Sequence, residues 1–372
     1  MLSELVGSTP PSDARPVSLA VREFLRERKS APGSYGLCIA VSGGADSLAL
    51  AVAAGDIAGR EQIPYTACIV DHQMRPGSGQ EADQVRTYLE SLGLRNVRVL
   101  RSEEQGSSTR PASPEGSARA LRYRLLEEAA LNFAGRLGLD RVDILLGHTM
   151  DDQAETVLMR LGRGSGALAL SAMAPVVSVV PVGPRALHRA RPLLGVRRAD
   201  TERFCRALGL TYLDDPTNAP DGPWRTKSGA PLPRAAIRAR VLPSLREALG
   251  QDPVPALARS AQLLREDSDA LEDWGERTLQ EALTETAQGP GLLVSVLRGQ
   301  PQAIVGRVLK SWAELCGADP LSQTQVGDLS ALLENPRNAA GDPRHVHLPG
   351  GLVAGRVAGE LRADASAAPP SV

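Results

Sequence analysis

The sequence has little of several features that would point at once to a class of protein. Only three of its 42 basic residues are lysines, aromatic residues make up 3%, and no apolar run approaches the roughly 18 residues that span a membrane. The first residues, MLSELVGSTPPSDARPVS, include acids and no apolar core, which is unlike a secretory signal. We therefore expect a cytoplasmic protein with no membrane partner.

Cysteine is scarce and unpaired. The four cysteines form no CxxC pair, and Cys38 and Cys68 lie in apolar, strand-like runs where a buried thiol is expected. His345 and His347 alternate as they would on a strand, with no acid or cysteine cluster beside them. The pattern indicates neither a disulfide framework nor a metal held by cysteine or histidine.

Charge is balanced over the whole chain but not locally. The formal net charge is -1, whereas residues 185–246 hold twelve Arg and one Lys against five acids, a net of about +8. Such a stretch can neutralise nucleic-acid phosphates. Because arginine replaces lysine throughout the chain, a solvated surface explains the same count, and the count alone does not decide between them.

Strand patterns and helix patterns alternate through the first 161 residues. Strands are predicted at 36–41, 65–70, 96–100 and 142–147, and helices at 17–28, 47–58, 79–92, 115–137 and 151–161. Strands that are apolar on both faces and separated by helices predict an α/β fold with a parallel sheet covered on both sides. Ligands bind such sheets at the carboxyl ends of the strands, so the polar stretches there should converge on one crevice.

Four parts are expected along the chain. The predicted parts are a flexible N-terminus (1–16), an α/β domain (17–250) with a basic extension over about 185–250, a smaller, mainly helical accessory domain (251–363) and a disordered tail (364–372). In the extension, Pro243 should break or kink a helix over 235–249. In the accessory domain, the segment 348–363 predicts a small hairpin.

The stretch CIAVSGGADSLALAV interrupts an apolar run with a glycine turn. Gly43 and Gly44 let backbone N–H groups approach an anion, the next helix presents its positive end, and Ser42 and Ser47 add hydroxyl donors. Asp46 would repel a phosphate unless Mg²⁺ lies between them or unless it caps the helix. Because no Lys follows the glycines, the loop favours a pyrophosphate leaving group; a turn that serves only packing is the plain alternative.

Three carboxylates gather in GHTMDDQAETVLMRLGRGSG. Asp151 and Asp152 open a helix, where acids suit the dipole, and Glu155 follows within one turn. Like charges at one place are costly unless a cation shares them, and Mg²⁺ or the ammonium group of an amino-acid substrate are the candidates. His148, at the end of a strand, could donate to a phosphate or act as a base.

Two weaker candidates accompany these motifs. In VDHQMRPGS, Asp71, His72 and Arg75 follow the second strand, where ribose or base often lies, although a polar turn explains them equally well. Arg119 and Arg122 are three residues apart on the long helix, and they either face solvent or point at the crevice.

Taken in order, the motifs resemble those of one family. The Ser-Gly-Gly-x-Asp-Ser loop resembles that of the PP-loop ATP pyrophosphatases, which adenylate a carbonyl oxygen and release pyrophosphate. Within that superfamily, the motifs similar to those of the tRNA(Ile)-lysidine synthases are VDHQMRPGSGQEA, EGSARALRY, GHTMDDQAETVLMRLGRGSG, RPLLGVRR and RAAIRARVLPSL. Ala235 stands where that family usually has Asn.

The resemblance implies a two-step reaction on tRNA(Ile) with a CAU anticodon. ATP would adenylate C2 of the wobble cytidine, and free L-lysine would displace AMP to give lysidine, which changes the codon read from AUG to AUA. ATP and Mg²⁺ are the implied cofactors. The oligomeric state stays open, with a homodimer as one option.

The resemblance also distributes roles over the candidate residues. The implied catalytic residues are Asp46, His148, Asp152, Glu155, Arg119 and Arg122. The implied ATP-binding residues are Ser42, Gly43, Gly44, Ala45, Asp46, Ser47, Asp71 and His72, and the implied metal ligand is Asp46. Substrate lysine would be bound by Asp151, Asp152 and Glu155. The tRNA would be bound by Arg160, Arg163, Arg197, Arg234 and Arg238.

Two other functions stay open at this point. A PP-loop tRNA thiolase would be expected to need a cysteine pair or an iron–sulfur site, and the sequence has no CxxC. A non-catalytic tRNA-binding relative would keep the fold, but the glycine loop and the acidic cluster both look intact. ATP–pyrophosphate exchange that depends on tRNA distinguishes an enzyme from a binding module.

Overall fold

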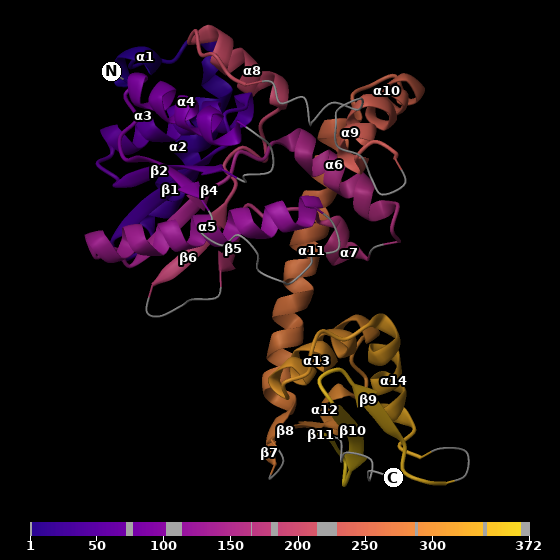
Figure 1. Cartoon of the computed structure of the whole chain (residues 1–372). Helices are drawn as coiled ribbons and strands as arrows, with labels where there is room; N and C mark the ends of the chain where they lie inside the picture. Colours follow the sequence, from indigo (N-terminus) through magenta and orange to yellow (C-terminus); the bar gives the residue numbers. More distant parts are fainter. Residues whose placement is uncertain are drawn as a thin grey trace. The chain divides into compact units, whose positions relative to one another are not determined.

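The structure is a computed structural model, and it divides into two compact units, Met1–Gln262 and Leu263–Val372 (Figure 1). The residues it describes are 2–71, 77–101, 114–164, 166–179, 185–213, 229–286, 289–337 and 341–365. Two residues predicted after the second strand, His72 and Arg75, lie outside these ranges, as does most of the predicted tail. None of the helices within them is apolar over a length that would cross a membrane.

A six-stranded sheet forms the centre of the first unit. Its strands are β1 (Tyr35–Val41), β2 (Tyr65–Asp71), β3 (Val97–Arg101), β4 (Arg141–Leu145), β5 (Val176–Val179) and β6 (Ala186–Ala190). They lie in the order β3-β2-β1-β4-β6-β5, and every neighbouring pair is parallel except β5 with β6. The predicted parallel α/β fold is confirmed.

Helices cover both faces of this sheet (Figure 1). The helices α2 (Arg15–Ser30), α3 (Ala45–Arg60) and α4 (Ser78–Ser91) share a core with one face, and α5 (Pro114–Leu137) shares a core with the other. Along β1, Leu37 and Ile39 point to the first face and Cys38 to the second, as the two-residue period of a strand requires. Cys38 and Cys68 are buried free thiols, which confirms their interpretation as core residues.

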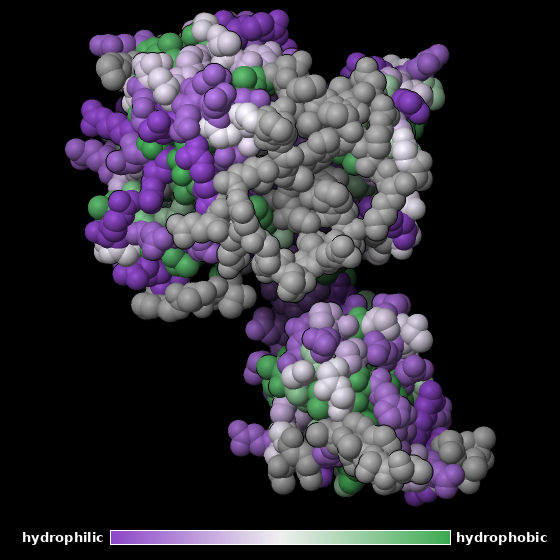
Figure 2. All heavy atoms as spheres, in the orientation of Figure 1, coloured by the Kyte–Doolittle hydropathy of each residue, from purple (hydrophilic) through white to green (hydrophobic). Residues whose placement is uncertain are grey.

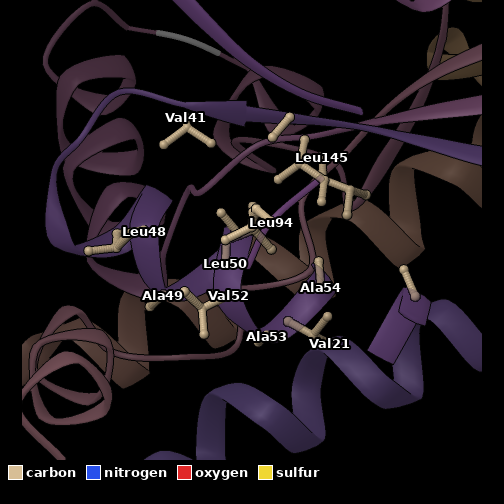
Figure 3. Packing of buried hydrophobic residues seen from close by; sticks show 14 of the residues in the cluster. Val21, Val41, Leu48, Ala49, Leu50, Val52, Ala53, Ala54, Leu94 and Leu145 are labelled. Carbon is tan, nitrogen blue, oxygen red and sulfur yellow. The ribbon is translucent and has the colours of Figure 1, made fainter. Parts of the chain in front are cut away.

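The first core is built around α3, whose residues are buried from Ser47 to Ala58. Figure 3 shows Leu50 of α3 between Leu145 of β4 and Val21 of α2. Full burial of one such side chain contributes on the order of 1.5–3 kcal/mol. The core therefore fixes the start of α3, and with it the glycine loop that precedes this helix.

The N-terminal segment differs from the flexible chain that the sequence predicts. A short helix, α1 (Leu2–Val6), buries Leu2 and Val6 against the first core, and Ala14 is also buried. A side chain at Gly55 would contact Leu2, so the glycine makes room for α1 on α3. Two apolar residues separated by polar ones were too weak a pattern to indicate this packing.

The basic extension and the segments around it are mostly helical. They comprise α6 (Met150–Leu161), α7 (Ala167–Leu170), α8 (Arg198–Ala207), α9 (Pro233–Ala236), α10 (Leu242–Leu249) and the start of α11 (Pro253–Ala282), which continues into the second unit. Pro243 has no N–H and crowds the preceding turn, and the chain there widens into a π-helical turn, η3 (Ile237–Val241), between α9 and α10. The predicted irregularity at Pro243 is thus a π turn rather than a break.

The second unit combines helices with an antiparallel sheet. Its elements after α11 are β7 (Leu283–Thr286), β8 (Gly289–Leu293), α12 (Val294–Leu297), α13 (Gln302–Leu315), α14 (Gln323–Glu334), β9 (His345–Leu348), β10 (Leu352–Val357) and β11 (Glu360–Ala365). The predicted hairpin is β10–β11, but it belongs to a five-stranded sheet ordered β7-β8-β11-β10-β9. Trp312 is fully buried in this unit and donates from Nε1 to the carbonyl of Pro290 at 2.9 Å.

On the face drawn in Figure 2, hydrophilic residues cover much of the coloured surface of each unit, and apolar residues are scattered among them. The apolar side chains instead fill one main core on each face of the sheet in the first unit and one main core in the second unit.

Candidate active site

The glycine loop joins the end of β1 to the start of α3. Gly43 has a φ of 88°, a left-handed conformation that favours glycine. The Ser47 hydroxyl accepts from the backbone N–H of Ser42 at 3.1 Å, lies 3.0 Å from the Ser42 hydroxyl and donates to the carbonyl of Gly44 at 3.0 Å. These bonds hold the loop closed over the first turn of α3, whose free N–H groups form an anion-binding end.

The loop after β4 lies directly against this glycine loop. A Cβ at Gly147 would lie 3.1 Å from both N and Cα of Ser47 and 3.2 Å from the carbonyl carbon of Asp46. With any side chain at this position, one of the two backbones would have to give by a few tenths of an ångström, so glycine favours this close approach. The predicted convergence of the polar stretches after the first and fourth strands is therefore present.

One arginine that is not among the residues predicted from the sequence connects the two stretches. Arg198, at the start of α8, donates from Nε to Asp46 Oδ2 at 3.1 Å and from Nη2 to Asp152 Oδ1 at 3.0 Å. Its Nη1 lies 3.4 Å from Glu155 Oε1. Thr201, one turn further along α8, donates its hydroxyl to Asp46. Asp46, Asp152 and Glu155 thus surround a single guanidinium group.

The spacing of apolar and small residues in the sequence could have predicted the helix α8, although not the position of Arg198. Thr201, Phe204 and Cys205 follow the i, i+3, i+4 pattern, and all three are fully buried. The placement of Arg198 among three acids had no such signal, because it depends on how α8 packs against α3.

Asp151 faces the beginning of α8 rather than the Arg198 guanidinium. Its Oδ2 accepts from the backbone N–H of Arg198 at 2.8 Å, and its two oxygens each accept from Arg197 at 3.1 Å. Asp151 therefore satisfies a free N–H group at the N-terminus of α8.

Two further arginines reach the acidic cluster from α9 and η3. Arg238 donates from Nε to Glu155 Oε1 at 2.8 Å, and Arg234 lies 3.8 Å from Asp152 Oδ1. From the sequence, Mg²⁺ or a substrate ammonium group is expected to supply the cation for this cluster. In the structure the chain's own arginines neutralise it.

Burial dominates the electrostatics of the site. It raises the pKa of Asp46, an effect that Arg198 and Thr201 only partly offset. Burial also favours the neutral form of Asp152, but Arg198, His148 and the N–H of Thr149 outweigh it, so the pKa of Asp152 is lowered. For His148, burial lowers the pKa to about 4, so the imidazole is neutral at pH 7.

The remaining predicted residues lie around this centre with other partners. Asp71 accepts from the Ser78 hydroxyl at 2.7 Å and lies 3.4 Å from Arg101, so its carboxylate ties β2 to α4 and β3. Arg119 lies over the ring of Tyr123, 5.1 Å from its centroid, and Arg122 is exposed.

Of the arginines predicted to bind tRNA outside the cluster, Arg160 donates to the carbonyls of Ala169 and Ala172 and so holds the segment around α7. Arg163 is exposed just beyond the end of α6.

The oxygen donors near the glycine loop suit a hard cation. Within the described residues, no group of three or more acidic, histidine or cysteine side chains is arranged to hold a metal. Asp46 and Asp152 nevertheless offer carboxylate oxygens that converge on one guanidinium, and carboxylates are ligands that Mg²⁺ prefers. The donor set fits Mg²⁺ that arrives with a triphosphate.

The fold and the site together define a class, the PP-loop ATP pyrophosphatases. A family model described as PP-loop domain matches residues 17–245, and one described as TilS substrate binding domain matches residues 292–362. The sequence is 39% identical over 355 residues to the tRNA(Ile)-lysidine synthase of Salinispora tropica, covering 94% of this chain and 97% of that protein. The tRNA(Ile)-lysidine synthase of Mycobacterium tuberculosis is 38% identical over 324 residues, covering 87% and 89%. The chain belongs to the tRNA(Ile)-lysidine synthase family.

A solved structure agrees at the level of the fold. The U34-tRNA thiolase NcsA of Methanococcus maripaludis superposes with a TM-score of 0.50 at 18% identity, covering 68% of this chain and 79% of the thiolase.

Proposed function

We propose that this protein ligates L-lysine to C2 of the wobble cytidine in the CAU anticodon of tRNA(Ile), with conversion of ATP to AMP and pyrophosphate. The observation that carries the proposal is the meeting of a pyrophosphate-type loop with a carboxylate cluster, joined by Arg198 at 3.1 and 3.0 Å, in a chain of this family. The first part suits adenylation, and the second suits the binding of a substrate ammonium group.

In the first step the loop and the start of α3 hold the departing pyrophosphate. The N–H groups of the first turn of α3 donate to its oxygens, and the Ser42 hydroxyl can join them once it gives up its bond to the Ser47 hydroxyl. Asp46 lies at the edge of this loop, where Mg²⁺ bound with ATP would add positive charge to the phosphates. His148 is neutral, so it acts as a hydrogen-bond donor or acceptor and not as a cation.

In the second step, Asp152 and Glu155 bind the positively charged end of lysine. Glu155 is completely buried, and its Oε2 has no hydrogen-bond partner among the described residues, so it can accept one from a substrate ammonium. Asp151, which bonds to Arg197 and to the backbone of α8, would position that helix instead of binding lysine.

The tRNA is proposed to bind over the basic extension. A single-stranded anticodon loop can present an unstacked cytidine to a pocket, and exposed arginines such as Arg163 can meet its phosphates. Arg234 and Arg238 pair with the cluster acids in this structure, so for them a tRNA phosphate would compete with Asp152 and Glu155. We place this reaction in the cytoplasm.

The decisive test is incorporation of radiolabelled lysine into purified tRNA(Ile) with a CAU anticodon, in the presence of ATP and Mg²⁺. The methionine tRNA with the same anticodon is the matched control. Label in the isoleucine tRNA alone supports the proposal. Release of AMP and pyrophosphate with no lysine label would preserve adenylation and refute lysine as the nucleophile. The absence of both would leave a tRNA-binding relative as the answer.

A second assay, ATP–pyrophosphate exchange, tests the role of Asp46. The variant Asp46→Ala should lose tRNA-dependent ATP–pyrophosphate exchange while it keeps tRNA affinity, since Asp46 lies on the glycine loop and not on the basic extension. Undiminished ATP–pyrophosphate exchange in Asp46→Ala would refute the proposed role of Asp46 in adenylation.

A further inference from the structure

Arg198 lies where a cationic ligand of the cluster would lie. Its guanidinium contacts Asp46 on the glycine loop and both Asp152 and Glu155 on α6, at 3.1, 3.0 and 3.4 Å. Only 21% of its side chain is exposed. The guanidinium is therefore largely enclosed by the site and is not a surface group that happens to point inward.

Glu155 shows that the cluster has capacity for a further donor. This side chain is completely buried, and both arginines that reach it, Arg198 and Arg238, contact the same oxygen, Oε1. Its other oxygen, Oε2, is buried and has no partner within the described residues. A buried carboxylate oxygen without a partner is costly, so it indicates a ligand group that binds there.

Charge balance limits which ligand can reach that oxygen. Asp46, Asp152 and Glu155 carry three negative charges, against Arg198 and Arg238 in contact and Arg234 at 3.8 Å. A cation that entered alone would meet a site that is already neutral and would be repelled by the guanidinium groups. A triphosphate changes this balance, since it offers Arg198 another anionic partner next to Asp46.

We propose that Arg198 is the resident counter-ion of this carboxylate cluster and sets the order of binding. Its ion pairs exclude free cations until a nucleotide triphosphate draws the guanidinium away, and the released carboxylates then bind the substrate ammonium. The order of binding rests on the function proposed above, whereas the counter-ion role does not.

The helix that carries Arg198 does not depend on its side chain. Phe204 and Cys205 are fully buried in the first core, and Thr201 bonds to Asp46. The backbone N–H of Arg198 is held by Asp151, a bond that any residue at position 198 can make. An Arg198→Met variant should therefore keep α8 in place and remove only the guanidinium.

The counter-ion role is tested with Mn²⁺ alone, titrated into the full-length protein without nucleotide and followed by electron paramagnetic resonance. Arg198→Met should bind one Mn²⁺ at least about tenfold more tightly than the wild type, and Arg198→Lys should stay within about twofold of it. The matched control is Arg203→Met, which removes the same charge from the same helix but from an exposed pair with Asp200. Adding Asp46→Asn to Arg198→Met should abolish the gain.

The counter-ion role would be overturned if folded Arg198→Met bound Mn²⁺ no more tightly than the wild type. It would also be overturned if Arg203→Met gained as much Mn²⁺ affinity as Arg198→Met. Circular dichroism establishes folding, and Arg198→Gln replaces Arg198→Met if the latter does not fold.

The order of binding is tested by equilibrium dialysis with L-lysine and no nucleotide. Arg198→Met should bind lysine at least about tenfold more tightly than the wild type. Unchanged lysine affinity would overturn the order. Failure of the lysine-labelling assay would instead refute the proposed function and leave the Mn²⁺ result intact.

Discussion

Gly147 is a residue at which a single added methyl group should slow adenylation. The new Cβ would lie 3.1 Å from N and Cα of Ser47 and 3.2 Å from the carbonyl carbon of Asp46. All three neighbours are backbone atoms of the glycine loop and the start of α3, so no flexible side chain can move aside. Either this loop or the one after β4 must shift by a few tenths of an ångström.

The magnitude follows from that contact. Overpacking a tight site costs about 1–3 kcal/mol, and displacing a catalytic loop loses about tenfold in rate for each 1.4 kcal/mol. We expect Gly147→Ala to lower kcat/KM for ATP by about 5- to 100-fold in tRNA-dependent ATP–pyrophosphate exchange. The affinity for tRNA should change little, because the glycine loop is proposed to bind ATP and is not part of the basic extension.

A glycine in α3, the helix that Gly147 packs against, controls for the substitution itself. Gly59 is in α3, and a methyl group added there would have no atom within 4 Å, so Gly59→Ala should leave exchange unchanged and stabilise the helix by about 0.5–1 kcal/mol. If Gly147→Ala is folded and its kcat/KM for ATP stays within about twofold of the wild type, the close contact does not position the loop.

Three more outcomes are expected. Glu155→Gln should raise the KM for lysine with little effect on ATP–pyrophosphate exchange; an unchanged lysine dependence in steady-state kinetics would contradict its role. Asp143→Asn should lower the free energy of unfolding of the first unit by about 3 kcal/mol, because buried Asp143 accepts from Arg28 at 2.7 and 2.9 Å and from the Tyr35 hydroxyl at 2.9 Å. Calorimetry should show a much smaller loss for Glu61→Gln, because its pair with Lys29 is exposed. His148 has a pKa lowered to about 4, so it remains neutral while the unfolded chain takes up a proton below about pH 6.5. Between pH 6.5 and 4 the free energy of unfolding of the wild type should therefore fall more than that of His148→Gln. If the two fall in parallel with pH, His148 is not buried as described.

The elements of the α/β fold could be predicted because local pattern and burial agree there. The start of α3, for example, follows from a glycine turn between two apolar runs, and β1 is apolar on both faces because helices cover both sides of the sheet. The second unit was harder to predict, because strands such as β7 and β9 have four residues each and alternate too briefly to be distinguished from loops.

The site was predictable in its acids but not in its cations. Asp152 and Glu155 share one helix, so their proximity follows from helical geometry. Arg198 meets them only because α8 packs against α3, a tertiary contact with no local signature. Arg234 and Arg238, predicted to bind tRNA, lie beside the same acids because α9 and η3 pack against α6, which is again a tertiary contact. Their contact with tRNA stays a prediction.

The Arg198 pairs also determine when during synthesis the site can exist. Arg198 is 152 residues from Asp46 along the chain, and Arg238 is 83 residues from Glu155. Contacts of such long range form late, because the loop-closure entropy must be met before they contribute. A nascent chain that has exposed the glycine loop and α6 but not α8 would carry the acidic residues without their guanidinium partners. The glycine loop and the carboxylates therefore come together with their arginines only when translation has passed the basic extension, so an incomplete chain holds the loop without an assembled site.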